Sequence, residues 1–225
     1  MKKVFLLLTL PLLALSFTAC NKGNDEGNDN KAKLVKQLSQ DNGYMDFEYD
    51  NQQRLTRVSG SIPVSTFTYA GNTITQNGKG FKNIFLLNSD GYLIERTYED
   101  DRFETYTYTY QNGYLHTVSL NNNLRFTCKW ENGNMVEKIY PSGKSAYFTY
   151  YDTEDKMNIE LITSMNIEGE LFKTKGLHSK NLLKQTDDYE GYSYKYTFDD
   201  QGYVTEIQVK REDSGNTYTQ TLTYY

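Results

Sequence analysis

The chain has 225 residues, with 24 Lys and Arg against 29 Asp and Glu, so its formal net charge is −5. Both signs are interspersed and no basic block occurs, which argues against nucleic acid and anionic lipid surfaces as partners. The 21 Tyr and 11 Phe against only 3 Pro favour pleated, half-buried strands.

The first residues have the pattern of a secretory signal. Lys2 and Lys3 precede an apolar stretch, Val4 to Phe17, which is shorter than the ~20 residues that a membrane helix needs. Small residues then lead to Cys20. This pattern predicts a lipoprotein signal over 1–19, after which Cys20 is acylated and anchors the chain to a membrane. The alternative is an ordinary cleaved signal with an incidental cysteine.

The next segment is polar. Residues 21–31, NKGNDEGNDNK, carry no apolar side chain and cannot bury enough surface to fold. We therefore expect a flexible tether over 20–31 and a single domain over 32–225. Once Cys20 is acylated, Cys128 is the only cysteine left. No intramolecular disulfide can form, so stability must come from burial and strand pairing.

Inside the domain, Asn-Gly pairs mark β-hairpins. In Tyr110-Gln-Asn-Gly-Tyr-Leu115, the Asn and Gly suit both central positions of a type I′ turn, so Tyr110 should face Leu115. Residues 130–135, WENGNM, repeat the pattern and should place Trp130 opposite Met135.

Other hairpins have one more loop residue. A three-residue loop ends in a left-handed residue, usually Gly, and Gly91 and Gly202 occupy that position. Three further pairs are then predicted: Leu87 with Leu93, Phe198 with Val204, and Tyr49 with Leu55, where Gln53 holds the glycine position. Such pairs fix the strand register.

The large first members of these pairs form a series of anchors along the chain: Tyr49, Tyr69, Leu87, Tyr110, Trp130, Tyr150, His178, Phe198 and Tyr224. Most are separated by about 20 residues, or two strands and two turns. We predict an all-β antiparallel meander of about 15 to 18 short strands. At most one short helix is expected, near 163–176, where the spacing is longer.

The pattern leaves open which face is buried. Val118 should fall on the face opposite to Leu115, and Ile207 opposite to Val204. Either the returning strands bulge, or both faces are partly covered, and we expect the second. The sheet should then curl strongly or close into a barrel. A membrane-spanning barrel is disfavoured, because it needs longer strands and an apolar outer band.

Several segments resemble known families. YDNQQRL (49–55) and FDDQGYV (198–204) resemble the YD repeat of Rhs-type proteins. GLHSKNLLKQ (176–185), YKYTFDDQGYVTEI (194–207) and YFTYYDTEDKMNIEL (147–161) resemble Bacteroidetes lipoproteins of the domain of unknown function 4595. That resemblance implies a curved, porin-like meander at the cell envelope and brings no catalytic residues.

Groups that could carry chemistry are few. His116 and His178 lie in no metal-binding pattern. The pairs Asp199-Asp200 and Asp100-Asp101 could bind calcium, but turn aspartates usually hydrogen-bond their own backbone. Cys128 is expected to be a packed thiol. We predict no catalytic residue, no metal site and no cofactor.

The aromatic side chains have functional potential, because exposed rings can stack on sugars. The candidate ligand-binding residues are Tyr106, Tyr108, Trp130, Tyr147, Tyr192 and Tyr194. The alternative, which their place in the repeat favours, is that they form the hydrophobic layer of the sheet.

These patterns predict a lipid-anchored, non-catalytic binding or scaffold protein of the cell envelope. We expect it at the outer membrane, on either the periplasmic or the surface face. Its partners would be the membrane, through the lipid on Cys20, and a glycan or an envelope protein. The alternatives are a glycan-binding or glycan-processing lipoprotein that uses exposed aromatics and turn carboxylates, and a structural spacer. The sequence leaves the oligomeric state open.

Overall fold

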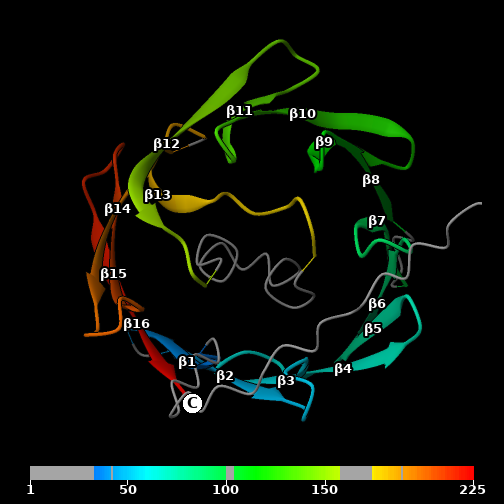
Figure 1. Ribbon diagram of the computed structural model, residues 1–225, viewed down its shortest axis with the longest axis horizontal. Coiled ribbons are helices and arrows are strands. Elements are labelled where there is room, and N and C mark those ends of the chain that lie inside the picture. The colour runs from blue at the N-terminus through cyan, green and yellow to red at the C-terminus, as the bar shows by residue number, and fades with distance from the viewer. Residues whose placement is uncertain (1–32, 42, 100–103, 158–173, 189) are drawn as a thin grey trace, which may run out of the picture. The chain divides into compact units, whose positions relative to one another are not determined.

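The strands of this chain close into a ring (Figure 1). The computed structural model describes residues 33–41, 43–99, 104–157, 174–188 and 190–225, all within the unit Lys33–Tyr225. Each strand pairs antiparallel with its neighbours in sequence, and β1 pairs with β16 to complete the barrel. The predicted all-β meander is confirmed, with sixteen strands in a closed sheet.

The strands are β1 (Val35–Gln40), β2 (Gly43–Tyr49), β3 (Leu55–Gly60), β4 (Ser65–Ala70), β5 (Thr73–Gly78), β6 (Phe81–Leu87), β7 (Leu93–Tyr98), β8 (Thr105–Gln111), β9 (Tyr114–Leu120), β10 (Asn123–Glu131), β11 (Asn134–Ile139), β12 (Ser145–Glu154), β13 (Asn181–Thr186), β14 (Tyr192–Phe198), β15 (Val204–Arg211) and β16 (Thr217–Tyr224).

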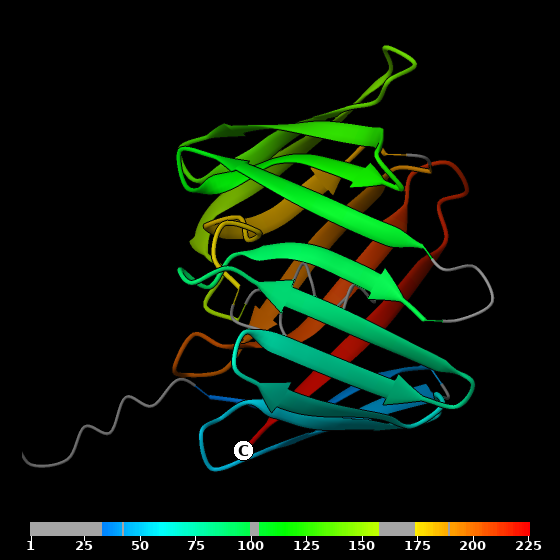
Figure 2. The same cartoon turned by 90° about the vertical axis from the view of Figure 1, so that its right-hand side faces the viewer.

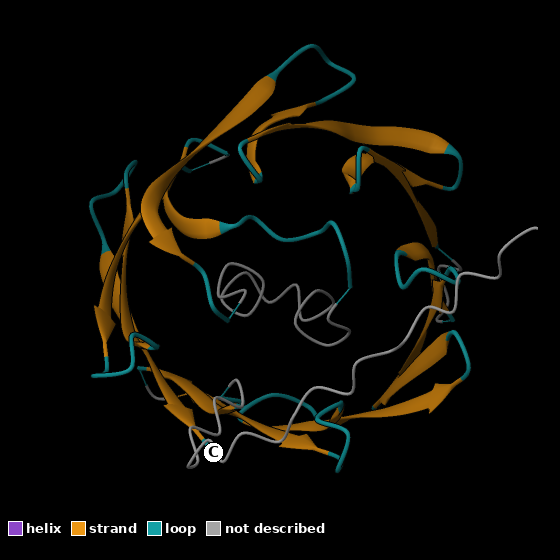
Figure 3. Ribbon diagram, viewed as in Figure 1, coloured by secondary structure: helices purple, strands orange, loops and turns teal. Residues whose placement is uncertain are grey.

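The described residues form strands and loops and contain no helix (Figure 3). Most of the region near 163–176, where one short helix was allowed, lies outside the described residues. Residues 174–176, which are described, include a turn. In the described part of the chain, no helix is long and apolar enough to cross a membrane.

The predicted hairpin pairs are confirmed. Tyr110 pairs with Leu115 and Trp130 with Met135, across turns whose Asn and Gly both have positive φ. The longer loops place Leu87 opposite Leu93, Phe198 opposite Val204 and Tyr49 opposite Leu55. Gln53 adopts the left-handed conformation expected at its position, with φ 61°.

Each of these five hairpins also contains a one-residue bulge, and this corrects the expectation that both faces are partly covered. In β9, for example, Thr109 pairs with Thr117 and Tyr110 with Leu115, so His116 is the extra residue. The bulge brings Leu115 and Val118 to the same face, where both are buried. The equivalent extra residues in the other four hairpins are Thr56, Ile94, Val136 and Thr205.

The bulges give the barrel an apolar inner face and a polar outer face. The largest cluster of buried side chains includes Phe47, Val58, Ile207 and Leu222, from β2, β3, β15 and β16. Exposed strand positions are mostly Thr or charged, and the charged ones are Lys36, Glu48, Arg57, Arg125, Lys129, Glu131, Asp152, Glu154, Lys184, Lys195, Glu206 and Lys210.

Aromatic side chains join consecutive hairpins. The Tyr110 hydroxyl donates to the Leu93 carbonyl at 2.8 Å, and the Trp130 indole N–H donates to the Leu115 carbonyl at 2.7 Å. The same bond links Tyr69 to Leu55, Tyr150 to Met135 and Tyr224 to Val204. In each case the accepting residue directly precedes a bulge. Because a bulge disrupts the ladder, it leaves a carbonyl available for the next hairpin. We call these bonds the anchor bonds.

Because the strands alternate in direction, the barrel has two different ends. The anchor end carries the turns at 50–54, 71–72, 88–92, 112–113, 132–133 and 199–203, together with Lys33 and Tyr225. It lies at the left in Figure 2, where the C-terminus is marked. The opposite end carries the turns at 61–64, 79–80, 121–122, 141–144 and 212–216.

Residues Thr174–Lys180 form an inner segment at the anchor end, inside the ring of strands (Figure 1). Three hairpin turns hold it through backbone hydrogen bonds. Its Gly176 carbonyl accepts from Leu115, and its Lys175 and Lys180 amides donate to Gly91 and Gly133. His178 was expected to be a hairpin anchor, and that prediction is wrong, because His178 lies in this segment and on no strand.

Candidate functional site

The inner face of the barrel becomes polar toward the end opposite the anchors, which we call the polar end. Its inward-facing side chains include buried groups that carry no charge, namely Ser65, Gln76, Asn83, Thr186 and Gln220. These residues lie in the halves of their strands that are nearer to this end. The polar end is therefore the part of the interior best equipped to recognise a polar ligand.

Three of these side chains form a hydrogen-bonded chain across β4, β5 and β6, which we call the amide chain. Asn83 lies directly opposite Gln76, and its Nδ2 donates to Gln76 Oε1 at 2.7 Å. Gln76 Nε2 then donates to Ser65 Oγ at 3.4 Å. The remaining amide oxygen, Asn83 Oδ1, is buried and has no hydrogen-bond partner among the residues that the structure describes. Such a group costs about 1–3 kcal/mol.

An arginine and two tyrosines lie beside the amide chain. Tyr98 on β7 faces Asn83, and the Arg96 guanidinium lies 4.0 Å from the centre of the Tyr98 ring. Tyr106 on β8 meets the Tyr98 ring edge-on at 6.0 Å. Burial lowers the pKa of Arg96, because it disfavours the charged guanidinium. Flat rings, one cation and neutral amides therefore share this part of the wall.

A second amide pair spans the seam between β1 and β16. Gln220 Nε2 on β16 donates to Gln40 Oε1 on β1 at 3.0 Å, and the two residues are direct cross-strand partners. Gln220 Oε1 is buried without a hydrogen-bond partner, as Asn83 Oδ1 is. Unpaired amide oxygens thus recur at the polar end.

The inner segment also holds buried polar atoms that receive no hydrogen bond from the described residues. Neither ring nitrogen of His178 has a hydrogen-bond partner, nor does Thr174 Oγ1. Burial lowers the pKa of His178 to about 4, although the Thr174 backbone opposes the shift. The ring is therefore neutral near pH 7. Ser179, in contrast, is bonded on both sides: it donates to Tyr150 Oη and accepts from the Met135 amide.

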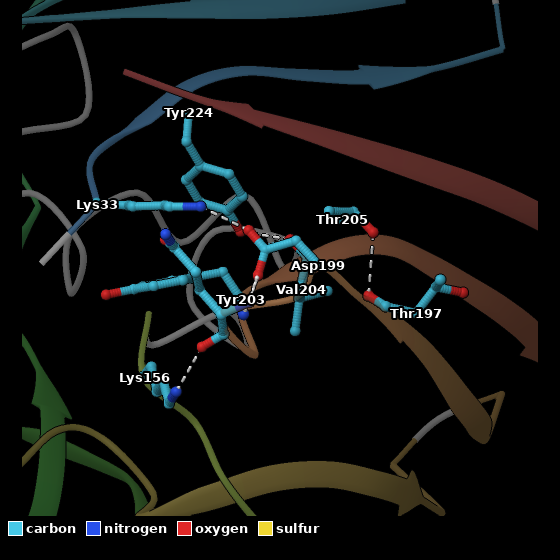
Figure 4. Close-up of polar contacts among 9 residues, drawn as sticks. Lys33, Lys156, Thr197, Asp199, Tyr203, Val204, Thr205 and Tyr224 are labelled. Carbon is cyan, nitrogen blue, oxygen red and sulfur yellow. Dashed lines mark hydrogen bonds and ion pairs between the residues drawn. The ribbon is translucent and has the colours of Figure 1, made fainter.

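The first described residue of the chain is tied to a turn at the anchor end (Figure 4). Lys33 Nζ donates to Asp199 Oδ2 at 2.6 Å and lies over the Tyr203 ring. Asp199 Oδ1 also accepts the amides of Gln201 and Tyr203. Lys33 and these amides lower the pKa of Asp199. From the other side, Lys156 Nζ donates to the Gln201 carbonyl.

The six candidate aromatic residues do not form one site. Tyr106, Tyr108 and Trp130 pack against the buried cluster of β8 to β13, and Tyr194 bridges that cluster and the largest one. Tyr192 packs against the largest cluster alone. Tyr147 lies on the outer face and is 54% exposed. Sugar stacking at these rings stays a prediction, and Tyr106 is the candidate that lies beside the amide chain.

The turn carboxylates serve their own turns. Asp50, like Asp199, accepts two backbone amides of its loop through Oδ1. Asp100 and Asp101 lie outside the described residues. Within the described residues, no three His, Cys, Asp or Glu side chains gather in a way that could hold a metal ion.

Two other side chains could carry chemistry, Cys128 and His116. Cys128 is buried, and burial raises the pKa of its thiol to about 11, as expected of a packed cysteine. His116 is half-buried at its bulge.

Sequence reasoning missed the amide chain. A signal was present, because Gln76 and Asn83 continue the alternation of the buried residues Ile74 and Phe85. A polar residue in phase with buried neighbours points to an inward polar group.

No protein-family model matches this chain, and no curated protein matches it. The resemblances to the domain of unknown function 4595 and to YD repeats therefore stay predictions. Among solved structures, the chain is similar to a porin-like protein from Bacteroides uniformis ATCC 8492, with TM-score 0.67 and 18% identity over 86% of this chain and 97% of that one. It is also similar to a porin-like protein from Bacteroides vulgatus ATCC 8482, with TM-score 0.62 and 13% identity over 85% and 98% of the two chains. This likeness shows that the chain has the fold of those porin-like proteins.

Proposed function

We propose that this chain is a lipid-anchored binding protein of the cell envelope, exported to the outer membrane, whose barrel stands in water. Acylated Cys20 would hold it to the membrane, and the barrel interior would hold its ligand. In this proposal the protein binds and does not catalyse. The engagement of Asp50 and Asp199 in their own turns supports that view, because glycan hydrolysis needs two free carboxyl groups.

One observation supports a barrel that faces water: the outer face carries exposed charges along its strands, and two of them, Arg57 and Lys195, lie in the middle of β3 and β14. Glu48, Arg57 and Lys129 are exposed on β2, β3 and β10, and Lys195 and Glu206 are exposed on β14 and β15. A Lys or Arg that faces the centre of a bilayer costs about 2–4 kcal/mol. Charges spread over opposite sides of the ring favour solvent on every side.

The lipid and its tether would join the barrel at the anchor end, because Lys33, which follows the predicted tether, lies there. The polar end, with its unpaired amide oxygens, would then be the far mouth of the barrel. The likeness to porin-like proteins of Bacteroides supports an envelope setting, since those barrels share this architecture.

Substitution of each of the two cysteines in turn tests the proposal. Cys20→Ala should release the protein from the membrane fraction and leave it folded in detergent-free buffer, because only the lipid holds it. The Cys128→Ala variant should stay in the membrane fraction, and only detergent should extract it. Fractionation of both variants, with circular dichroism of the released form, measures this. A Cys20→Ala protein that still needs detergent for extraction would show that the barrel wall itself contacts lipid.

A further inference from the structure

The amide chain ends in an acceptor that receives no hydrogen bond from the described residues. Asn83 is 3% exposed, and its Oδ1 has no hydrogen-bond partner. The bonds of the chain all run one way, from Asn83 to Gln76 and from Gln76 to Ser65. The free oxygen therefore lies at the Asn83 end, beside Tyr98 on the neighbouring strand. Native proteins satisfy most buried polar atoms, so such an atom points to a missing donor.

The chemistry of the surroundings narrows that donor. A carboxylate or a phosphodiester has no hydrogen to offer a carbonyl oxygen, so these anions do not fit Asn83 Oδ1. An ammonium group would be repelled by Arg96, whose guanidinium lies over Tyr98 and near Phe85. A neutral hydroxyl or amide N–H remains. The Tyr98 and Tyr106 rings, 6.0 Å apart, add aromatic surface of the kind that contacts the C–H faces of sugars.

We propose that the amide chain Ser65–Gln76–Asn83, together with Tyr98, binds a neutral hydroxylated ligand of sugar size, one hydroxyl of which donates to Asn83 Oδ1. The site lies at the polar end, away from the residue that joins the tether. This inference rests on the proposed binding function and gives it a ligand class. It also selects Tyr106, out of the six candidate aromatics, as the ring that lies beside the ligand.

The intact lipoprotein in a detergent without a sugar headgroup tests the site. The probes are glucose, galactose, N-acetylglucosamine and maltose, each followed by saturation-transfer NMR, with isothermal titration of any sugar that binds. At least one sugar should bind, and Asn83→Leu should weaken it by about tenfold, since it removes the acceptor and keeps the size. Asn77→Leu is the matched control: Asn77 is exposed on the outer face of β5, and binding should be unchanged.

A second measurement does not depend on how the variant folds. In the unmodified protein, the bound sugar should shift the side-chain amide resonance of Asn83, and a crystal of the complex should show a hydroxyl on its Oδ1. Binding by none of the sugars, with an ordered water on that oxygen instead, would overturn the inference. Equal affinity of a sugar for the Asn83→Leu variant and for the unmodified protein would also overturn the inference. Neither result touches the cysteine test, which needs no ligand, so failure of the site and failure of the proposed function remain distinguishable.

Discussion

The two ends of the barrel are made of the same strands but use their polar side chains differently. At the anchor end, tyrosine and tryptophan donors bond to carbonyls that the bulges leave available, as Tyr110 does to Leu93. At the polar end, the inward amides bond only in part, and Asn83 Oδ1 and Gln220 Oε1 keep no partner. We infer that the anchor end holds the barrel together, while the polar end carries its capacity to bind. Four changes test this division, in order of expected effect.

Deletion of Thr109 should have the largest effect. Thr109 lies on β8 opposite the bulge, between the inward-facing Tyr108 and Tyr110, so its deletion makes these two neighbours and turns one of them to the outer face. We expect a loss of about 4 kcal/mol or more in the free energy of unfolding, or no folding at all. Urea unfolding followed by circular dichroism measures it. Deletion of Ser214, in the exposed turn at the polar end, is the control and should be tolerated; equal losses would mean that the alternation of inward and outward side chains on β8 does not stabilise the barrel.

Gly176→Ala should come next. Gly176 has φ +75°, and an added Cβ would meet the Gly113 carbonyl and the rings of Tyr110 and Tyr92. Backbone strain and this clash together should cost about 3 kcal/mol. Gly143→Ala separates the two causes, because Gly143 has φ +79° with open space around it. Similar decreases in melting temperature in both variants would mean that the inner segment does not pack tightly against the hairpin turns.

His178 should make stability depend on pH. Its folded pKa is about 4, below the unfolded value of about 6.5, so the native state takes up the proton less readily. The contribution of the neutral His178 ring to the free energy of unfolding is complete above pH ~6.5. It is lost as the pH falls toward 4, and the loss between pH 7.5 and 5 is about 2 kcal/mol. His178→Gln should flatten this part of the profile, while His116→Gln should keep it. A slope that survives in His178→Gln would assign the effect to other groups.

Tyr110→Phe should have the smallest effect. It removes one anchor bond and keeps the ring, so we expect a loss of about 1 kcal/mol. Tyr44→Phe, at a side chain 45% exposed, is the matched control and should change the free energy of unfolding by less than about 0.5 kcal/mol. If the two variants unfold at the same urea concentration, the anchor bonds do not stabilise the barrel.

The turns and their pairs could be predicted because they depend on local chemistry. Asn112 and Gly113 suit a type I′ turn whatever surrounds them, and the turn then places Tyr110 opposite Leu115. Curling or closure of the sheet is predicted correctly, but from partial cover of both faces, which the bulges disprove.

Bulges are one of two explanations that the sequence allows, but their positions could not be predicted, because the extra residues are not of one type. Thr205 bonds through its hydroxyl to the Thr197 carbonyl (Figure 4), but Ile94, His116 and Val136 hold the same position without a hydroxyl. Only the three-dimensional pairing shows which residue is extra. The candidate site depends on the same information, since the inward direction of Asn83 is known only once the face is known.

The anchor bonds have a consequence for how such a barrel could evolve. Each bond joins a hairpin to its predecessor alone, and even Tyr224, on the last strand, bonds to Val204 in the same way. Duplication or loss of one sequence unit would therefore change the circumference by two strands and leave every other joint intact. The circumference of the ring would then be set by the number of repeated gene segments rather than by substitutions within the strands.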